Sequence, residues 1–161
     1  MNAIFCRGAY YAPGVNFMEK EIFPPMHTAE HLINGMMVKK FGCNRCFRDH
    51  IEKKKSKLDY KFERNLTEEE LREIEAGVNK VITEDLKVFE EFVPLEIAKE
   101  KYNLSRLPEN LSGDLRIIKI GDYDSAPCQG PHVGSTKEIG EVKIISSDWE
   151  DGVLRLRYKL V

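Results

Sequence analysis

The sequence predicts an α+β fold in which a largely antiparallel β-sheet carries its helices on one face. Two long segments of the 161-residue chain, 27–41 and 67–86, repeat apolar residues at helical spacing. Five shorter segments have the apolar runs or the alternation of strands, and the last two are close enough in sequence to pair antiparallel. Helices and strands mixed in this order indicate helices packed on one face of an antiparallel sheet.

The first helix is predicted over residues 27–41. Pro24 and Pro25 come just before it and Gly42 comes just after, and such residues commonly begin and end helices. Its periodic apolar residues are Ala29, Leu32, Ile33, Met36, Met37 and Phe41. A basic stretch over 45–57 then leads into residues 58–62, where apolar and charged residues alternate as in a half-buried strand.

The second helix has the clearest signals at its start. Thr67 and Glu70 have the spacing of a capping box, and three glutamates in the first turn suit the helix dipole. An apolar stripe then runs to about Leu86. Beyond it we expect a strand at 88–93, a short helix at 95–102 and a loop at 103–114. A strand at 115–120 and an irregular segment at 121–135 follow. Strands at 139–146 and 153–160 then flank a hairpin turn at 148–152.

Composition indicates a globular protein of one domain, or at most two small ones. Hydrophobic residues make up 42% and charged residues 32%, and the length suffices to bury a core without disulfide bonds. No stretch approaches the roughly 20 apolar residues that span a membrane. The first residues lack the basic start and apolar run of a signal peptide. We therefore expect a cytoplasmic protein without membrane contacts, whose four cysteines are thiols or metal ligands.

Charge is distributed unevenly along the chain, although the net charge is only −2. Residues 39–64 contain ten lysines or arginines against four acids, whereas residues 65–100 contain four against eleven. Lysine contacts phosphate through charge, without reading bases. The predicted nucleic-acid contacts are therefore Lys53, Lys54, Lys55 and Lys57, and the alternative for this run is a solvated loop.

Two pairs of metal-binding residue types share one spacing. His27 and His31 lie four residues apart near the start of a helix, so their imidazoles lie on one side of it. Cys128 and His132 have the same spacing in a loop rich in glycine and proline. Nitrogen and sulfur ligands suit zinc, so the sequence predicts one zinc ion held by His27, His31 and Cys128, with or without His132. His132 is expected to be the loosest ligand because it ends a flexible loop.

Two further patterns lead to weaker hypotheses. With its neighbours, Glu30 completes the HxxEH pattern of one class of zinc peptidase, in which it would polarise a metal-bound water. The reading we prefer is a solvated glutamate at a helix start, where it favours the dipole. Cys43 and Cys46 form a CxxC pair, but no second such pair completes a zinc site, so we interpret them as part of a loop after the helix.

Three segments, HTAEHL, LTEEELREIEAGVN and CQGPHVGSTKEIG, resemble the editing domains of alanyl- and threonyl-tRNA synthetases in their order. The length resembles the free-standing alanyl-tRNA editing proteins. The resemblance covers residues 25–161 as an editing-like domain and leaves 1–24 as an arm of unknown role. It implies a zinc-dependent trans-editing hydrolase whose partner is the aminoacylated end of tRNA and whose ligands are the four residues named above. The expected substrate is seryl-tRNA(Ala), with glycyl-tRNA(Ala) next; the alternatives are a seryl-tRNA(Thr) deacylase and a non-catalytic, zinc-stabilised tRNA-binding module.

The chain departs from the alanine-type pattern near the expected substrate. That pattern reads Cys-Gly-Gly-Thr-His, whereas this loop has Gln129 and Pro131, and its Gly-Pro-His ending resembles threonine-type domains. Arg48 falls where alanine-type domains carry a glutamine, and it is one candidate catalytic residue. Gly130, whose backbone N–H could stabilise an oxyanion, and Thr28, whose hydroxyl could bind that of serine, are the others. Gln129 or Pro131 could form the wall that excludes threonine.

Overall fold

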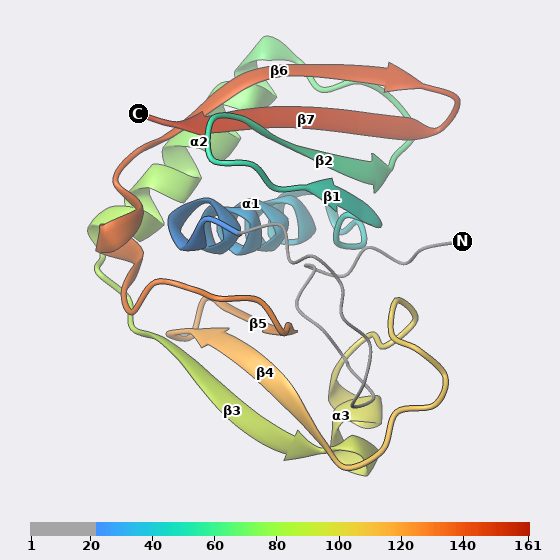
Figure 1. Ribbon diagram of the computed structural model, residues 1–161. Helices are drawn as coiled ribbons and strands as arrows, with labels where there is room; N and C mark the ends of the chain where they lie inside the picture. The colour runs from blue at the N-terminus through green and yellow to red at the C-terminus, as the bar shows by residue number, and fades with distance from the viewer. Residues whose placement is uncertain (1–21) are drawn as a thin grey trace.

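The computed structural model describes residues 22–161 (Figure 1). In chain order the elements are α1 (Pro24–Phe41), β1 (Arg48–His50), β2 (Ser56–Lys61), α2 (Glu68–Thr83), β3 (Val88–Pro94), α3 (Leu95–Lys101), β4 (Asp114–Ile120), β5 (Asp124–Pro127), the 3-10 helix η1 (Thr136–Ile139), β6 (Val142–Glu150) and β7 (Val153–Leu160). The arm predicted over 1–24 lies almost wholly outside the described residues. No helix within residues 22–161 combines the length and the apolar character that crossing a membrane requires.

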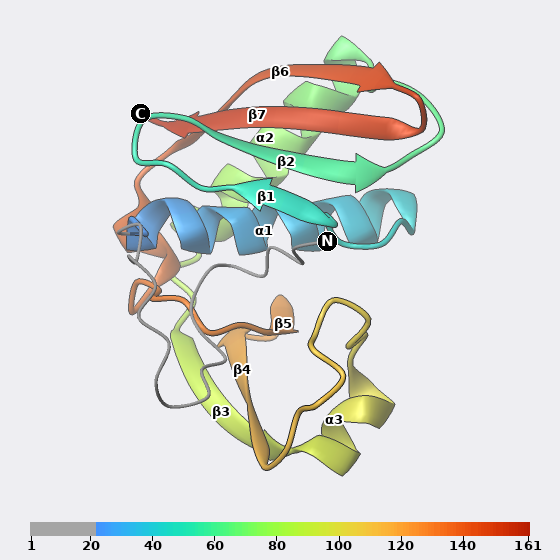
Figure 2. The same ribbon diagram turned by 45° about the vertical axis from the view of Figure 1, so that its right-hand side comes forward.

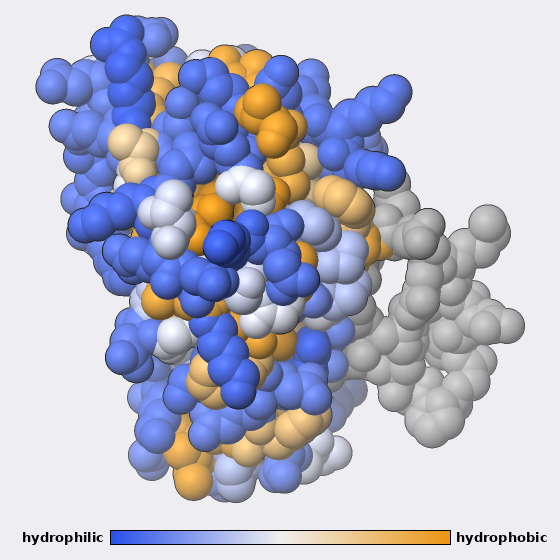
Figure 3. Space-filling model, turned by 90° about the vertical axis from the view of Figure 1, so that its left-hand side faces the viewer, coloured by the Kyte–Doolittle hydropathy of each residue, from blue (hydrophilic) through white to orange (hydrophobic). Residues whose placement is uncertain are grey.

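The described strands form two antiparallel sheets, which confirms the predicted α+β class but divides its strands between two sheets. The larger sheet has the order β1-β2-β7-β6 and the smaller one the order β3-β4-β5. Helix α1 runs between the two sheets, and α2 packs against α1 and β6 (Figures 1 and 2). The face drawn in Figure 3 is mostly hydrophilic, with apolar residues visible in narrow gaps.

Helix α1 is buried around its whole circumference over residues 26–35. One side of its main core is formed by β2 and β7 through Leu58, Tyr60, Leu154, Leu156 and Tyr158, and the other by β4 through Ile118 and Ile120. The helix ends as predicted, since Gly42 takes the left-handed conformation (φ 64°) and its N–H bonds to the Val38 carbonyl. Its beginning at Pro24 is three residues earlier than the periodicity indicated.

Helix α2 confirms the predicted capping box, in which Thr67 and Glu70 exchange side-chain and backbone hydrogen bonds. Its apolar stripe packs into the main core through Ile74, Val78, Val81 and Ile82. The polar side of the helix shields the edge of β6: Asn79 both accepts from the Val142 N–H and donates to its carbonyl, each at 2.8 Å. These contacts block part of a sheet edge that would otherwise present unpaired backbone groups.

Several local predictions need correction. The segment 121–135 is not wholly irregular, because β5 within it pairs with β4. The basic stretch before β2 contains β1, a strand of three residues that pairs with β2. The predicted turn at 148–152 shortens to Asp151 and Gly152, whose positive φ values of 47° and 81° suit a tight two-residue hairpin. Strand β6 begins only at Val142 because the preceding residues 136–139 form the 3-10 helix.

Candidate metal centre

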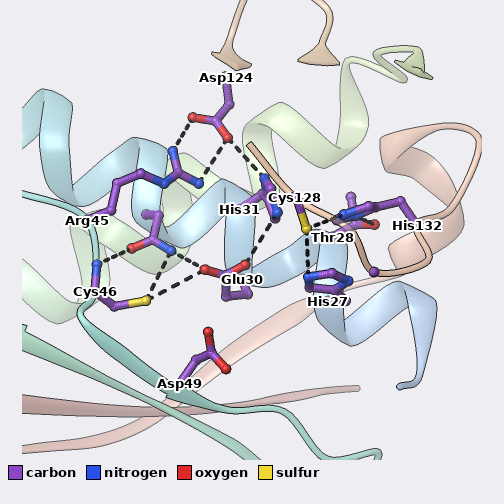
Figure 4. A network of polar contacts seen from close by, with 12 residues as sticks. His27, Thr28, Glu30, His31, Arg45, Cys46, Asp49, Asp124, Cys128 and His132 are labelled. Atoms are coloured by element: carbon purple, nitrogen blue, oxygen red, sulfur yellow. Dashed lines mark hydrogen bonds and ion pairs between the residues drawn. The ribbon is translucent and has the colours of Figure 1, made fainter. Parts of the chain in front are cut away.

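The structure brings together the four residues for which the sequence predicted a zinc site. His27 and His31 project from the same side of α1, one turn apart, while Cys128 and His132 come from the loop that follows β5 (Figure 4). One ligand atom from each residue lies within 4.8 Å of the others. The rings of His27 and His132 stack with centroids 4.1 Å apart. The two sequence pairs therefore converge on one point between α1 and the smaller sheet.

Hydrogen bonds to the outer ring nitrogens aim two of the imidazoles at the thiol. Nδ1 of His27 lies 2.9 Å from the Pro131 carbonyl oxygen, which fixes this nitrogen as the N–H donor. Nε2 of His27 then faces Sγ of Cys128 at 3.4 Å, and Nε2 of His132 lies at the same distance from this sulfur. Such outer hydrogen bonds typically orient metal-binding histidines.

Thr28 orients His132, and this changes the role we predicted for its hydroxyl. Its Oγ1 lies 2.9 Å from Nδ1 of His132, accepts the Val133 N–H at 3.2 Å and donates to the Pro24 carbonyl at 3.1 Å. A hydroxyl has one hydrogen to donate and two lone pairs, so all three are used. Thr28 is therefore a positioning residue, and its hydroxyl has no capacity left for a serine substrate.

His31 is held by carboxylates on both sides of its ring. Nδ1 lies 3.4 Å from Asp124 Oδ2 and Nε2 lies 3.5 Å from Glu30 Oε2. Burial alone would lower the pKa of His31, but these carboxylates and Cys128 raise it to about 10. Asp124 also accepts two hydrogen bonds from Arg45, at 2.6 and 3.2 Å, and this cation together with His31 overcomes burial and holds the pKa of Asp124 at about 2.

The donor set fits a zinc ion. Three imidazoles and one thiol form a nitrogen-and-sulfur set of the kind that zinc prefers, with the right number of ligands for a tetrahedral site. All four residues come from buried or half-buried positions. The carboxylates near His31 add negative charge that would favour a bound cation. Zinc at this centre stays a prediction that the donor chemistry supports.

The loop that carries Cys128 is fixed by Arg116 on β4, which donates to the carbonyls of Cys128 and Gly130 at 3.0 and 2.9 Å. Gly130 packs directly against His27, since a Cβ built on it would overlap ring atom Cε1. A residue with a side chain would push the imidazole aside. The structure thus gives Gly130 a steric role, and its predicted role as oxyanion donor stays a prediction.

Glu30 is buried, so our preferred reading of it as a solvated glutamate at a helix start was wrong. Only 2% of the residue is exposed, and Asn34 donates to Oε1. The Cys46 thiol lies 3.6 Å from the same oxygen. The helical periodicity could not show this burial, because the second layer that covers this side of α1 comes from distant strands.

A second buried group of possible ligands lies beside the first and consists of Glu30, Cys46 and Asp49, again within 4.8 Å of one another. Burial and the nearby Glu30 raise the pKa of Asp49 to about 7. Arg106 compensates this group, since Nη2 lies 3.6 Å from Asp49 and Nη1 donates to the Cys46 carbonyl. Because an arginine already supplies the positive charge, we interpret the group as a polar network. Cys43 lies apart from it and points its thiol at the Met37 carbonyl.

The remaining predicted site residues lie elsewhere. Arg48 is on the face of β1 that points away from α1, where Nε donates to Asp59 at 2.8 Å and half of the side chain is exposed. We therefore withdraw Arg48 from the catalytic candidates; its neighbour Asp49 is the residue of this strand that points inward. Lys53, Lys54 and Lys55 are exposed in the loop between β1 and β2, and Lys57 is half-buried on β2.

Comparison with known proteins identifies the domain. Residues 115–157 match the family model described as threonyl and alanyl tRNA synthetase second additional domain. Over 137–142 residues the chain is 39% identical to the alanine–tRNA ligase of Staphylothermus marinus, 34% to that of Ignicoccus hospitalis and 35% to that of Aeropyrum pernix. Each match covers 82% of this chain but only 15% of the ligase.

These matches define the class as a domain shared by two tRNA synthetases, and they confirm the resemblance in the three sequence segments. Within that class, the chain belongs to the family of domains found in alanyl-tRNA synthetases. The matched segment 115–157 includes Cys128 and His132 but not the histidines of α1. The chain spans about one seventh of the length of these relatives.

We expect one zinc ion per chain, bound by the cluster of His27, His31, Cys128 and His132. Replacing Cys128 by Ala removes the only sulfur ligand of the cluster, so zinc measured by elemental analysis should fall from one equivalent to a small fraction of one. Cys43→Ala is the matched control, because this thiol lies outside the cluster and its loss should leave the zinc content unchanged. Full zinc retention in Cys128→Ala would refute the ligand assignment.

Asp124 is expected to strengthen zinc binding by orienting His31. Asp124→Asn keeps the size of the side chain but removes the charge beside Nδ1, and the loss of such an outer contact typically lowers metal affinity 10–100-fold. Competition with a coloured chelator measures this change. Asp49→Asn is the control, since it neutralises another buried carboxylate that has an arginine partner and makes no hydrogen bond or ion pair with the four ligands within residues 22–161. Equal losses in both variants would mean that general destabilisation, not orientation, is responsible.

Proposed function

We propose that this domain deacylates mischarged tRNA by cleaving the ester between a wrong amino acid and the terminal adenosine. The observation that carries the proposal is the convergence of two histidines from α1 with the cysteine and histidine of the loop after β5. The family supports the proposal, because its model is described as a second additional domain of threonyl- and alanyl-tRNA synthetases. We further propose that it acts in trans, in the cytoplasm, on tRNA already released by a synthetase.

An aminoacyl ester is already activated, so the site needs an oriented water, a stabilised oxyanion and a pocket that excludes the correct amino acid. A zinc ion, when bound, would supply Lewis acidity and lower the pKa of a bound water to about 7. Four protein ligands at once would close the site. We therefore propose that His132, the half-buried member of the cluster, is the ligand that yields. The backbone N–H at Gly130 is the proposed oxyanion donor.

Serine is the proposed substrate because its hydroxyl distinguishes it from alanine. A site that hydrogen-bonds this hydroxyl leaves its own polar groups unpaired when alanine enters, and discrimination can then reach about 10⁴. Because the Thr28 hydroxyl is already engaged, a zinc ion held by the four residues would be the remaining partner for the serine hydroxyl. Threonine carries the same hydroxyl plus a methyl group, so its exclusion requires a steric wall, for which Gln129 and Pro131 remain the candidates.

Two alternatives follow from particular residues. The Gly-Pro-His ending of the loop favours seryl-tRNA(Thr) as substrate instead of seryl-tRNA(Ala). The engaged hydroxyl of Thr28 and the outward position of Arg48 remove two candidate catalytic groups, and this favours a non-catalytic, zinc-stabilised tRNA-binding module. The same assay distinguishes all three.

We expect the 161-residue chain alone to hydrolyse seryl-tRNA(Ala), and glycyl-tRNA(Ala) more slowly, while sparing alanyl-tRNA(Ala). Initial rates on these three substrates and on seryl- and threonyl-tRNA(Thr), measured side by side, provide the test. Cys128→Ala serves as the control for contaminating hydrolases and should be inactive. Faster cleavage of seryl-tRNA(Thr) would favour the threonine-type alternative. Absence of hydrolysis of every ester, with tRNA still bound, would favour the binding module.

The lysine loop between β1 and β2 is expected to contribute to tRNA affinity. Replacing Lys53, Lys54 and Lys55 with Ala should weaken binding and flatten its dependence on salt, because each lost phosphate contact lowers the slope of log K against log salt by about 0.7–0.9. Filter binding at four or five salt concentrations measures the slope. An unchanged slope would assign these lysines to a solvated loop.

A further inference from the structure

The four-stranded sheet has one face covered by helices and one face that carries an array of cations. Strand alternation sends Leu58, Tyr60, Leu154, Leu156 and Tyr158 into the core. The residues between them point the other way, and within residues 22–161 both α1 and α2 lie on the core side (Figures 1 and 2). We call this the outer sheet face; its charged residues are Arg48, His50, Lys57, Asp59, Lys61, Lys143, Asp148, Glu150, Arg155, Arg157 and Lys159.

Like charges stand directly opposite one another on the outer sheet face. Lys57 pairs in register with Arg157, and Lys143 pairs with Lys159. Such cross-strand pairs are destabilising. Arg157 and Lys143 each have a carboxylate partner, but Lys57 and Lys159 have no ion pair within residues 22–161. The sheet thus contains two like-charge pairs whose repulsion a bound anion would reduce.

A hollow of about 260 Å³ opens at one end of the outer sheet face. It is lined by His50, Glu52, Lys55, Ser56, Lys57 and Arg157, so cationic side chains outnumber the single carboxylate. Lys55 belongs to the lysine loop between β1 and β2, and the hollow therefore joins that loop to the outer sheet face in one basic surface. A phosphate group matches the charge of the lysines and the arginine that line it.

The densest group of acidic residues lies elsewhere. Helix α2, on the core side of the same sheet, carries glutamates throughout its first two turns at Glu68, Glu69, Glu70, Glu73 and Glu75. The outer sheet face therefore has an excess of cations and α2 has an excess of acids, although the net charge is near zero; the two groups meet where Lys143 pairs with Glu75. Such separation orients an approaching polyanion toward the basic side.

We propose that the outer sheet face binds the phosphate backbone of the acceptor duplex of tRNA. Lysine and arginine rows on neighbouring strands form a flat array of cations, and RNA duplexes are recognised mostly by shape and by backbone contacts. Strand β1 connects this face to the metal centre, because Arg48 lies on the outer side and its neighbour Asp49 lies beside Glu30. The single-stranded end of the RNA would pass around this edge. The identity of the RNA as tRNA rests on the proposed function.

The test compares two variants that remove the same charge. Lys57→Gln with Lys159→Gln removes two of the three cations of the outer sheet face that have no ion pair within residues 22–161; the third is Lys61. Lys80→Gln with Lys101→Gln removes two exposed lysines from α2 and α3. Binding of an uncharged acceptor-stem RNA hairpin is measured against salt. The Lys57→Gln, Lys159→Gln double variant, the face variant, should lower the slope of log K against log salt by about 1.4–1.8. The Lys80→Gln, Lys101→Gln double variant is the control and should leave this slope unchanged. The Tm of the face variant should equal or exceed that of the wild type, because like-charge repulsion is relieved.

A second substrate separates this inference from the proposed function. Seryl-adenosine ester has no duplex, so the wild type and the face variant should hydrolyse it at equal rates, while KM for seryl-tRNA rises in the face variant. If neither protein hydrolyses the ester, the proposed function fails but the binding comparison still stands. Equal salt slopes in both variants would overturn the inference, as would binding to anionic lipid vesicles without binding to the RNA hairpin.

Discussion

The candidate metal centre depends on the burial of α1 between two sheets. His27, Thr28, Glu30, His31 and Asn34 are all at most 2% exposed, so none of them can rely on water. A buried polar group without a hydrogen bond costs on the order of 2–7 kcal/mol relative to water. Each of these side chains therefore has a partner from its own helix or from another element. The imidazoles of His27 and His31 at the candidate metal centre are consequently held by contacts within the chain.

Two ion pairs connect the larger sheet with the smaller sheet. In each pair, an arginine from a loop that leads to one sheet contacts an aspartate on a strand of the other sheet. Arg45, in the loop leading to the larger sheet, pairs with Asp124 on β5 of the smaller sheet. Arg106, in the loop leading to the smaller sheet, pairs with Asp49 on β1 of the larger sheet. Buried ion pairs contribute little net stability, but they require a specific geometry. The Arg45–Asp124 pair fixes β5, the strand from which the loop with Cys128 and His132 begins, and the Arg106–Asp49 pair fixes β1.

Local sequence patterns predicted the features that are encoded within a few neighbouring residues. They missed the features that depend on contacts between elements far apart in the sequence. The capping box at Thr67 and the stop at Gly42 are encoded within a few residues, and both were confirmed. Strand β1 was missed because its three residues show no pattern until β2 pairs with them. Glu30 was misread for the same reason, since helical position alone does not reveal the layer that covers it. The four ligand candidates were found because their spacing and residue types are themselves informative.

Strand β1 separates two electrostatic environments, and this separation matches the chemistry of the proposed substrate. On its inner side Asp49 joins Glu30 in a region rich in carboxylates, while on its outer side Arg48 belongs to a basic face. An aminoacyl-tRNA carries a cationic ammonium on the amino acid and an anionic phosphate chain next to it. The phosphate chain would lie on the basic outer side of β1, whereas the carboxylates on its inner side already have Arg106 as a cationic partner. The three residues of this edge strand alternate in direction, and they thereby separate the basic outer face from the carboxylate group around Asp49.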